Sequence, residues 1–302
     1  MIRFDDKVAV VTGAGAGLGR EHALLLASRG AKVVVNDIGG AVDGAGGDKF
    51  PADKVVNEIK AAGGEAVANY DSVATREGGE AIVQTAIDTW GRIDILVCNA
   101  GVLRDKTFIK TDLEDFEFVF NVHFFGTLYC AHAAWKFMND QEYGRIVFTT
   151  SIAGTSGNFG QSNYGSAKLG MVGLMNTLAI EGAKRNVKVN CISPGAMTRM
   201  TGNLGMDEEF LAKLRPELVS PAVAYLCSED CEASGTTITA AAGGFGRVHM
   251  FETRGVQFDP APGVTIEQVA ENFDAITDLT KGDPCFPGAE GKIQERLNTL
   301  GS

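Results

Sequence analysis

The sequence has few basic residues, few histidines and no long hydrophobic segment. Of its 302 residues, 27 are Lys or Arg and 38 are Asp or Glu, which gives a formal net charge of −11. Such a charge repels phosphate backbones and anionic lipids, so we expect no nucleic-acid partner. No apolar run approaches the roughly 18 to 20 residues that span a bilayer, and the opening MIRFDDK lacks the basic and apolar regions of a secretion signal. We therefore expect a cytoplasmic protein without membrane insertion.

Residues that bind metals are scarce and poorly spaced. Cys227 and Cys231 would share one face of a helix, yet neither a second cysteine pair nor matching histidines accompany them. The six cysteines lie mostly in apolar segments, where we expect reduced packing residues. The four histidines show no paired ligand spacing either: His22, His123, His132 and His249. The sequence therefore predicts no metal in the chemistry.

A glycine-rich turn, TGAGAGLG at residues 12–19, follows the first apolar run. Glycines there permit a tight turn and the close approach of a pyrophosphate, which the N-terminus of the next helix would stabilise. The alternative is an ordinary strand-to-helix turn. A second apolar run ends in Asp37, an acceptor suited to a ribose 2′-hydroxyl. Because Ala16 and Ile38 offer no cation to a 2′-phosphate, the sequence favours NAD over NADP.

Three proton-handling residues lie in SIAGTSGNFGQSNYGSAK, residues 151–168. Ser151 closes an apolar run, and if residues 163–181 are helical, Tyr164 and Lys168 share one face. A free tyrosine has a pKa near roughly 10, so a neighbouring cation is needed to favour the phenolate at neutral pH. Lys168 would supply that cation, and Ser151 would hold a substrate oxygen. A tyrosine and a lysine four residues apart also occur by chance on solvated helices.

Apolar runs alternate with helical segments along the chain. Strands are expected at 7–12, 32–36, 65–69, 95–99, 144–150, 187–193 and 236–240, and helices at 20–29, 52–62, 79–90, 112–139 and 164–184. Since each parallel crossover needs a covering helix, this order predicts an α/β fold, a Rossmann-like doubly wound parallel sheet with helices on both faces. Cofactor and substrate then gather at the carboxyl ends of the strands.

Together with Asn99, Ala100 and Gly101, these motifs resemble the short-chain dehydrogenase/reductase family over about residues 6–246. The family pattern is T-G-x-x-x-G-x-G, then N-A-G after the fourth strand, then Ser, Tyr and Lys in this spacing. The resemblance implies one catalytic and NAD-binding domain, residues 1–246. It also implies a homodimer or homotetramer. Residues 247–302 would form a C-terminal extension that packs on the domain or on a neighbouring subunit.

The resemblance also assigns roles to single residues. Tyr164 would accept the substrate proton, and Lys168 would lower the tyrosine pKa and bind the nicotinamide ribose. Asp71, with Ser72 beside it, would hold the adenine edge, or else Asp71 only caps a helix. The implied cofactor-binding residues are Gly13, Gly17, Leu18, Gly19, Asp37, Asp71, Ser72, Asn99, Ala100, Gly101, Tyr164, Lys168, Pro194, Gly195 and Thr198.

One position departs from the family pattern. Members usually carry an asparagine three residues before a glycine in the helix after the N-A-G strand. Counting back from Gly126 places His123 there, with Asn121 displaced by two. His123 would either join a proton relay through water to Lys168 or pack in the helix with its imidazole satisfied by backbone.

Longer phrases narrow the resemblance. VNDIGG, NAGVLRD and GNFGQSNYGSAKLG are similar to the (3R)-hydroxyacyl-CoA dehydrogenase units of peroxisomal multifunctional enzymes of type 2, also called 17β-hydroxysteroid dehydrogenases type 4. This implies NAD-dependent oxidation of a (3R)-3-hydroxyacyl-CoA to the 3-oxoacyl-CoA. A 17β-hydroxysteroid or a steroid-side-chain CoA ester is the alternative substrate, and a non-catalytic dinucleotide-binding regulator is the distant alternative.

The expected substrate is a small lipid. Residues 199–215 form an apolar segment where this fold carries its substrate-covering helices, and such a lid suits a fatty chain or a steroid equally. Arg104, Lys106 and Arg199 could meet CoA phosphates, or each could be a solvated surface residue.

Overall fold

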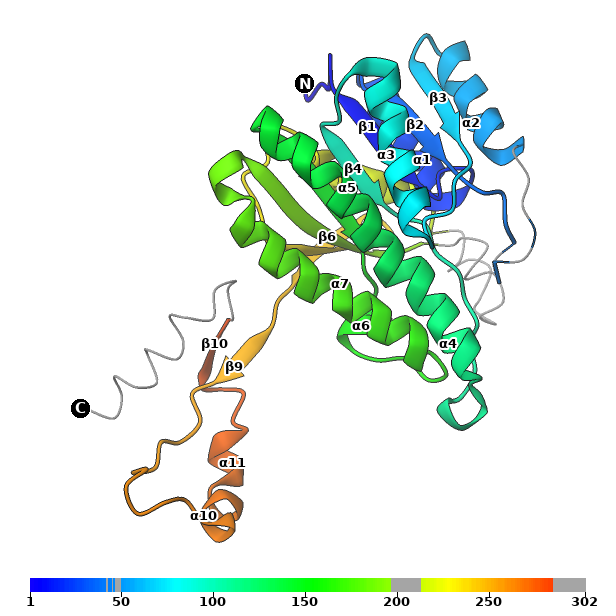
Figure 1. Ribbon diagram of the computed structural model, residues 1–302. Coiled ribbons are helices and arrows are strands. Elements are labelled where there is room, and N and C mark those ends of the chain that lie inside the picture. The colour runs from blue at the N-terminus through cyan, green and yellow to red at the C-terminus, as the bar shows by residue number, and fades with distance from the viewer. Residues whose placement is uncertain (42, 45, 47–49, 197–212, 285–302) are drawn as a thin grey trace. The chain divides into compact units, whose positions relative to one another are not determined.

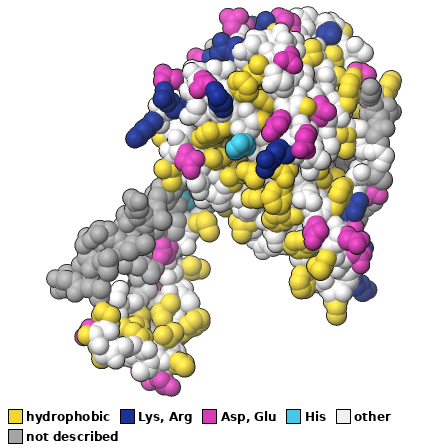
Figure 2. Space-filling view, in the orientation of Figure 1, with side chains coloured by type: hydrophobic (Ala, Val, Ile, Leu, Met, Phe, Trp, Pro, Cys, Tyr) yellow, Lys and Arg dark blue, Asp and Glu magenta, His cyan; other side chains and the backbone are white. Residues whose placement is uncertain are grey.

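The computed structural model describes residues 1–41, 43, 44, 46, 50–196 and 213–284. Its chain divides into two compact units, residues 1–247 and 248–302. No described helix is long and apolar enough to cross a membrane. On the face seen in Figure 2, Lys and Arg side chains are interspersed with Asp and Glu.

An eight-stranded sheet with helices on both faces forms the centre of the first unit (Figure 1). The strand order is β3-β2-β1-β4-β5-β6-β7-β8, and every pairing from β3 to β7 is parallel. The strands are β1 (Val8–Thr12), β2 (Lys32–Asn36), β3 (Glu65–Asn69), β4 (Ile95–Cys98), β5 (Gly144–Thr149), β6 (Val187–Gly195), β7 (Thr237–Ala241) and β8 (Gly244–Val248). The Rossmann-like sheet expected from the sequence is confirmed.

The last strand of this sheet was not expected. β7 and β8 are joined by Ala242 and Gly243, which have φ angles of 49° and 80°. Two adjacent residues at positive φ make the tight turn of a β-hairpin, so β8 folds back along β7.

The helices pack on the sheet through two separate hydrophobic cores. Along β1, Ala9 and Val11 belong to the core that includes α1, α2 and α9, while Val8 and Val10 belong to the core that includes α3, α5 and α7. This division follows from the alternation of side chains along a strand. The helices are α1 (Gly17–Ser28), α2 (Phe50–Ala61), α3 (Arg76–Trp90), α4 (Leu113–Phe120), α5 (Gly126–Gln141), α6 (Ile152–Thr155), α7 (Ser162–Glu181) and α9 (Ser220–Leu226), with 3-10 turns η1 (Phe108–Lys110), η3 (Ala183–Arg185) and η4 (Pro216–Leu218).

The single helix expected at 112–139 is divided in the structure. A π-helical turn, η2 (Asn121–Phe125), separates α4 from α5. Hydrophobic periodicity does not reveal such a turn, because apolar residues continue through all three elements. Wide turns of this kind are frequent at functional sites, and this one contains His123.

The second unit contains an antiparallel strand pair, β9 (Phe251–Thr253) with β10 (Gly282–Pro284). The amphipathic stretch before β10 forms two short helices, α10 (Ile266–Glu271) and α11 (Phe273–Ile276). A capping box starts α10, in which the Thr265 hydroxyl accepts from the Gln268 N–H and the Gln268 side chain accepts from the Thr265 N–H. The packing partner expected for this extension stays a prediction.

Candidate active site

A cleft of about 610 Å³ lies at the carboxyl ends of the parallel strands. Its lining includes residues that follow each of the strands β1 to β6. Strand order reverses between β1 and β4, and ligands of open α/β sheets bind at such a point. The sequence predicts that both cofactor and substrate bind at this edge of the sheet. We call this region the main cleft.

The glycine turn after β1 is fixed by contacts with the end of β4. Asn99 donates from its side-chain amide to the carbonyl oxygens of Thr12 and Gly13, at 3.0 and 3.1 Å. The Thr12 hydroxyl in turn accepts from the backbone N–H groups of Asn99 and Ala100, at 3.0 and 3.1 Å. Gly13 has a φ of 63°, and a Cβ there would lie 2.7 Å from the Ala100 Cα. This position therefore requires glycine.

The turn fits the pyrophosphate of a dinucleotide. Among the described residues, no side chain caps the N-terminus of α1, and its first turn contains no acidic residue. The first N–H groups of α1 stay available for an anion, and the positive end of the helix dipole favours one. Gly13, Gly17 and Leu18 line the main cleft, whereas Gly19 packs beneath the turn, where a Cβ would collide with the Gly13 carbonyl.

Asp37 follows β2 and is half-buried at the edge of the main cleft. Its carboxylate accepts from the N–H groups of Gly15 at 2.8 Å and Gly39 at 2.6 Å. The carboxylate is thus fixed beside the glycine turn. A 2′-phosphate in this place would meet a negative charge.

Asp71 and Ser72 follow β3 and line the same cleft. The cap of α3 is Thr75, whose hydroxyl accepts from the Gly78 N–H at 3.1 Å. Asp71 is therefore not the cap of that helix, and the helix-capping alternative for it is wrong.

Ser151, Tyr164 and Lys168 meet in the main cleft. Ser151 is the N-cap of α6, and its hydroxyl accepts from the Ala153 N–H at 3.2 Å. Tyr164 lies in the first turn of α7 and Lys168 one turn later, as the spacing predicted. The Lys168 ammonium lies 5.4 Å from the centre of the Tyr164 ring and donates to the Thr149 carbonyl oxygen at 2.5 Å.

Burial controls the electrostatics of this pair. It lowers the pKa of Lys168, which is only 2% exposed, to about 7. Burial also raises the pKa of Tyr164, and a hydrogen bond from Ser151 opposes that shift. The sequence predicted a lowered tyrosine pKa. In the protein alone the direction is the opposite, because desolvation of the phenolate outweighs the hydrogen bond with Ser151, and the nearby charge of Asp105 raises the pKa further.

The lowered pKa of Lys168 predicts a pH-dependent stability. The folded pKa of about 7 lies below the 10.5 of an exposed lysine, so the unfolded chain binds more protons between these values. The cost of burying the charge is therefore complete below about pH 7 and disappears as the pH rises toward 10.5. We expect Lys168→Met without added cofactor to exceed the parent in free energy of unfolding by several kcal/mol at pH 6, with the difference shrinking at higher pH.

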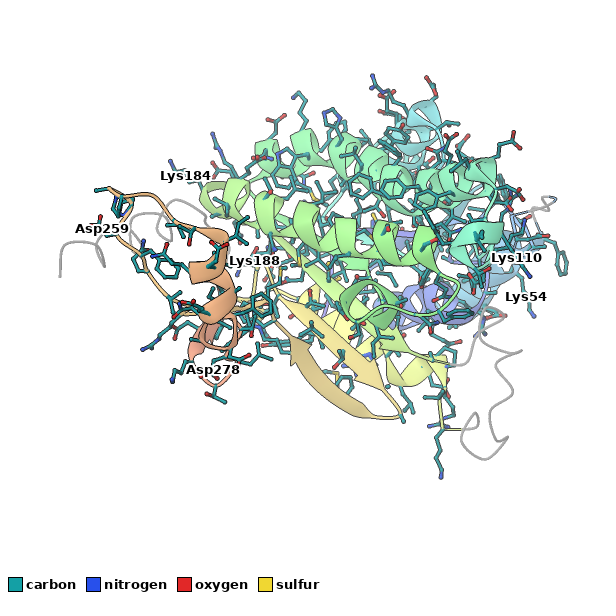
Figure 3. The ribbon with its side chains drawn as sticks, turned by 90° about the horizontal axis from the view of Figure 1, so that it is seen from below. Lys54, Lys110, Lys184, Lys188, Asp259 and Asp278 are labelled. Atoms are coloured by element: carbon teal, nitrogen blue, oxygen red, sulfur yellow. The ribbon has the colours of Figure 1, made fainter. Side chains whose placement is uncertain are left out.

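Urea unfolding of both proteins between pH 6 and 9.5 measures this difference. Lys184→Met is the matched control, because Lys184 is exposed in η3 just beyond α7 (Figure 3). Its substitution should leave the pH dependence of the parent unchanged. A gap between Lys168→Met and the parent that stays constant over the whole range would contradict a lowered Lys168 pKa.

His123 lies in the π-helical turn and is 1% exposed. Its Nε2 atom lies 2.7 Å from the Val102 carbonyl oxygen and 3.0 Å from the Val102 nitrogen. The imidazole ring stands edge-on to Tyr164 with centroids 5.0 Å apart, and burial holds its pKa well below the ordinary value. Nδ1 has no partner among the described residues. The relay to Lys168 stays a prediction.

Other predicted residues divide into three groups. Ala100, Gly101, Pro194 and Gly195 line the main cleft. Arg104 and Lys106 are paired with acidic side chains, through Asp115 for both and Asp112 for Lys106. Thr198, Arg199 and most of the predicted lid lie outside the described residues.

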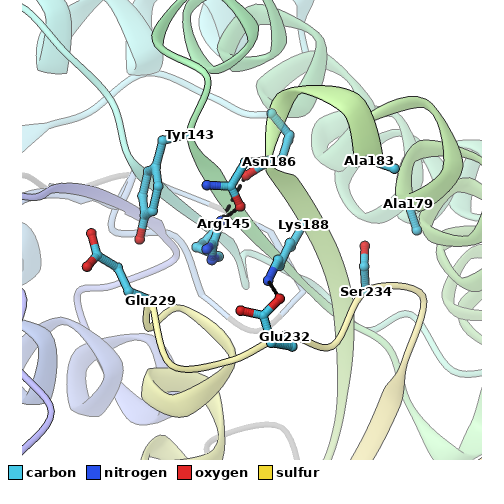
Figure 4. Close-up of a pocket in the computed structure, with 10 residues that line it drawn as sticks. Tyr143, Arg145, Ala179, Ala183, Asn186, Lys188, Glu229, Glu232 and Ser234 are labelled. Carbon is cyan, nitrogen blue, oxygen red and sulfur yellow. Dashed lines mark hydrogen bonds and ion pairs between the residues drawn. The ribbon is translucent and has the colours of Figure 1, made fainter.

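A second pocket, of about 530 Å³, lies at the amino ends of β5 and β6 (Figure 4). Arg145 is buried there and donates from Nη1 to the Gly144 and Asn186 carbonyl oxygens, both at 2.9 Å. Lys188 is paired with Glu232 at 2.5 Å. Arg145 and Lys188 already have protein partners. Their charges are therefore explained by the fold and do not indicate a ligand in this pocket.

Sequence reasoning missed three residues that hold the site together. Thr12 anchors the N-A-G segment, and Asn36 and Asn69 are buried amides at the ends of β2 and β3. An asparagine that ends an otherwise apolar strand is a usable signal, because a buried amide needs partners. The backbone carbonyl of Thr149 accepts a hydrogen bond from Lys168, and no sequence pattern indicates such a backbone contact.

Comparisons with known proteins agree with this geometry. Residues 7–209 match the family described as short chain dehydrogenase. A short-chain type dehydrogenase/reductase of Mycobacterium tuberculosis is 51% identical over 275 residues, covering 91% of this chain and 95% of the relative. The peroxisomal multifunctional enzyme type 2 of Drosophila melanogaster is 51% identical over 303 residues, covering 99% of this chain. This chain spans only 50% of that enzyme.

Two solved structures show the same fold. The full-length Drosophila enzyme superposes with a TM-score of 0.83 at 43% identity, over 99% of this chain and 50% of the enzyme. A 7α-hydroxysteroid dehydrogenase complexed with NADH and 7-oxo glycochenodeoxycholic acid has a TM-score of 0.71 at 31% identity, over 80% of this chain and 95% of that one.

Proposed function

Because this chain belongs to the short-chain dehydrogenase family, we propose that it oxidises a (3R)-3-hydroxyacyl-CoA to the 3-oxoacyl-CoA with NAD. The observation that carries the proposal is the arrangement of the main cleft. Ser151, Tyr164 and Lys168 lie in the same cleft as the glycine turn, whose following helix α1 has no side-chain cap among the described residues. Asp37, held by hydrogen bonds from backbone N–H groups, lines the same cleft. A secondary alcohol and a dinucleotide can therefore meet there.

The substrate class rests on the relatives. Several of them are named peroxisomal multifunctional enzymes or hydratase-dehydrogenase-epimerases, and this chain matches one part of each. The segments GNFGQSNYGSAKLG and NAGVLRD support the proposal that this part is the 3-hydroxyacyl-CoA dehydrogenase unit. A hydroxysteroid is the second candidate, supported by the bile-acid complex of the 7α-hydroxysteroid dehydrogenase.

Each residue of the site has a part in the proposed reaction. The Ser151 hydroxyl hydrogen-bonds the substrate oxygen, and Tyr164 as phenolate accepts the hydroxyl proton. Lys168 binds the nicotinamide ribose and, when charged, stabilises that phenolate. Asp37 binds the adenosine ribose, and Asp71 accepts from the adenine amino group. Bound NAD supplies the hydride acceptor.

The direct test is NADH formation by the purified chain. We expect turnover with NAD and a (3R)-3-hydroxyacyl-CoA, and much slower turnover with a 17β-hydroxysteroid. The reverse preference would favour the steroid candidate. Absence of turnover with every secondary alcohol would support the non-catalytic regulator.

Location and assembly are further proposals. The predicted cytoplasmic location competes with a peroxisomal one, since the multifunctional relatives carry that word in their names. We propose a homodimer or homotetramer, in which residues 247–302 pack on the domain or on a neighbouring subunit. Only the resemblance to the family supports this assembly. Fractionation of the source cells and light scattering of the purified chain measure these properties.

Replacing Asp37 by Ala tests the cofactor preference. The loss of one hydrogen bond to a charged group should weaken NAD binding by roughly 1 to 3 kcal/mol. NADP should gain relative to NAD, because the repulsion of its 2′-phosphate disappears. Dissociation constants for both cofactors measure the change.

Asp37→Asn is the matched control for this substitution, because it keeps the size of the side chain and removes the charge. Gly15 and Gly39 donate to different carboxylate oxygens, so the single amide oxygen of Asn keeps only one of these two contacts. It should improve NADP binding with a smaller loss of NAD. Equal use of NAD and NADP by the parent protein would overturn the proposed role of Asp37.

A further inference from the structure

Two buried asparagines end neighbouring strands beneath the predicted adenine region. Asn36 is the last residue of β2 and Asn69 the last residue of β3, and the two are paired in register. They are 2% and 6% exposed. The Asn36 amide donates to Asn69 Oδ1 at 2.8 Å. Polar pairs in such positions need a reason, because burying an amide costs free energy unless it is fully bonded.

Asn69 uses its whole hydrogen-bonding capacity. Its Nδ2 donates to Asp71 Oδ2 at 2.7 Å and to Thr85 Oγ1 at 2.9 Å. Its Oδ1 accepts from Asn36 Nδ2 and from the Asp71 N–H, at 2.8 and 3.0 Å. A flipped amide would place its NH2 group against two donors and its oxygen against a carboxylate. The orientation is therefore determined.

The two asparagines make three hydrogen bonds with Asp71. Its carboxylate and its backbone N–H are both held by Asn69, and its carbonyl oxygen accepts from Asn36 Nδ2 at 2.9 Å. Asp71 is exposed and lines the main cleft. In the part of the chain that the structure describes, no hydrogen bond reaches its other carboxylate oxygen, Oδ1. An exposed aspartate would otherwise sample several rotamers, and fixing one in advance reduces the entropy cost of binding.

We propose that Asn69 is a positioning residue for cofactor specificity. It orients the Asp71 carboxylate so that the unpaired oxygen accepts a hydrogen bond from the exocyclic amino group of adenine, and Asn36 holds Asn69 in that orientation. The inference rests on the proposed NAD-dependent function. It predicts that discrimination of the base depends on Asn69, although Asn69 itself does not line the cleft.

The test compares NADH with reduced nicotinamide hypoxanthine dinucleotide, in which a carbonyl oxygen replaces the adenine amino group. Binding is measured by the fluorescence of the reduced nicotinamide. The parent should bind NADH at least about tenfold more tightly, because the analogue presents an acceptor to a carboxylate. Asn69→Asp keeps the size and the Oδ1 contacts but places an oxygen against Asp71. It should reduce the preference to within about threefold.

Thr85→Val is the matched control. It removes a different bond of the same amide and leaves the contacts with Asp71 intact. Its preference for NADH should equal that of the parent. For Asn69→Asp, the KM for NAD should rise while kcat at saturating NAD stays unchanged, since the adenine site is remote from the reacting atoms. A general loss of structure would lower kcat as well.

The outcomes separate this inference from the proposed function. A parent that binds no NADH, or does not distinguish the two dinucleotides, refutes the cofactor or adenine assignment of the proposed function. A parent that distinguishes them while Asn69→Asp does so equally well refutes the role of Asn69. If Asn69→Asp fails to fold, Asn69→Ser replaces it, because the shorter side chain cannot reach Asp71; the same loss of preference is expected.

Discussion

Tyr164→Phe should lower kcat for alcohol oxidation by roughly a hundredfold to ten-thousandfold, the usual effect of removing an acid-base group. Only the phenolic oxygen is lost. The ring should stay in place, because it packs edge-on against His123 with centroids 5.0 Å apart. NADH binding should therefore remain within about twofold of the parent. Steady-state kinetics and a fluorescence titration measure the two quantities.

Tyr143→Phe provides the comparison for this variant. Tyr143 lines the second pocket, at the opposite end of β5 from Ser151, so loss of its hydroxyl should leave kcat unchanged. A Tyr164→Phe enzyme that kept more than about a tenth of the parental rate would remove Tyr164 from the proton-accepting role.

The second large effect concerns stereochemistry, and we expect kcat/KM for (3R)-3-hydroxyacyl-CoA to exceed that for the S enantiomer by at least about a hundredfold. The substrate oxygen must meet both Ser151 and Tyr164 while the carbinol hydrogen faces the nicotinamide. With the acyl chain and the thioester fixed on opposite sides, only one enantiomer satisfies all three demands. A hundredfold preference corresponds to about 2.7 kcal/mol in transition-state free energy.

The parts of the fold that follow from local patterns could be predicted from the sequence. Apolar runs of strand length alternate with helical segments, so the parallel sheet and its order of elements were accessible. The Ser151, Tyr164 and Lys168 constellation was accessible as well, since a spacing of four residues on a helix fixes a shared face. The glycine turn was predictable because glycine adopts a positive φ more readily than other residues do. Gly13 has such a φ in the structure.

The remaining features depend on tertiary contacts that sequence patterns do not contain. The pairing of Asn36 with Asn69 arises from the register of β2 and β3, which lie far apart in the sequence. The raised pKa of Tyr164 comes from desolvation, which depends on the assembled cleft. The π-helical turn at His123 interrupts a segment whose apolar pattern is continuous.

The central claim is stereospecific oxidation of an acyl-CoA alcohol, and the most direct measurement is kcat/KM for the two enantiomers of one 3-hydroxyacyl-CoA with NAD. NADH formation reports the rate for each, and the Tyr164→Phe protein serves as the blank. We expect kcat/KM for the R enantiomer to be at least about a hundredfold above that for the S enantiomer. Equal rates on both enantiomers, or activity on a 17β-hydroxysteroid with none on either acyl-CoA ester, would contradict it.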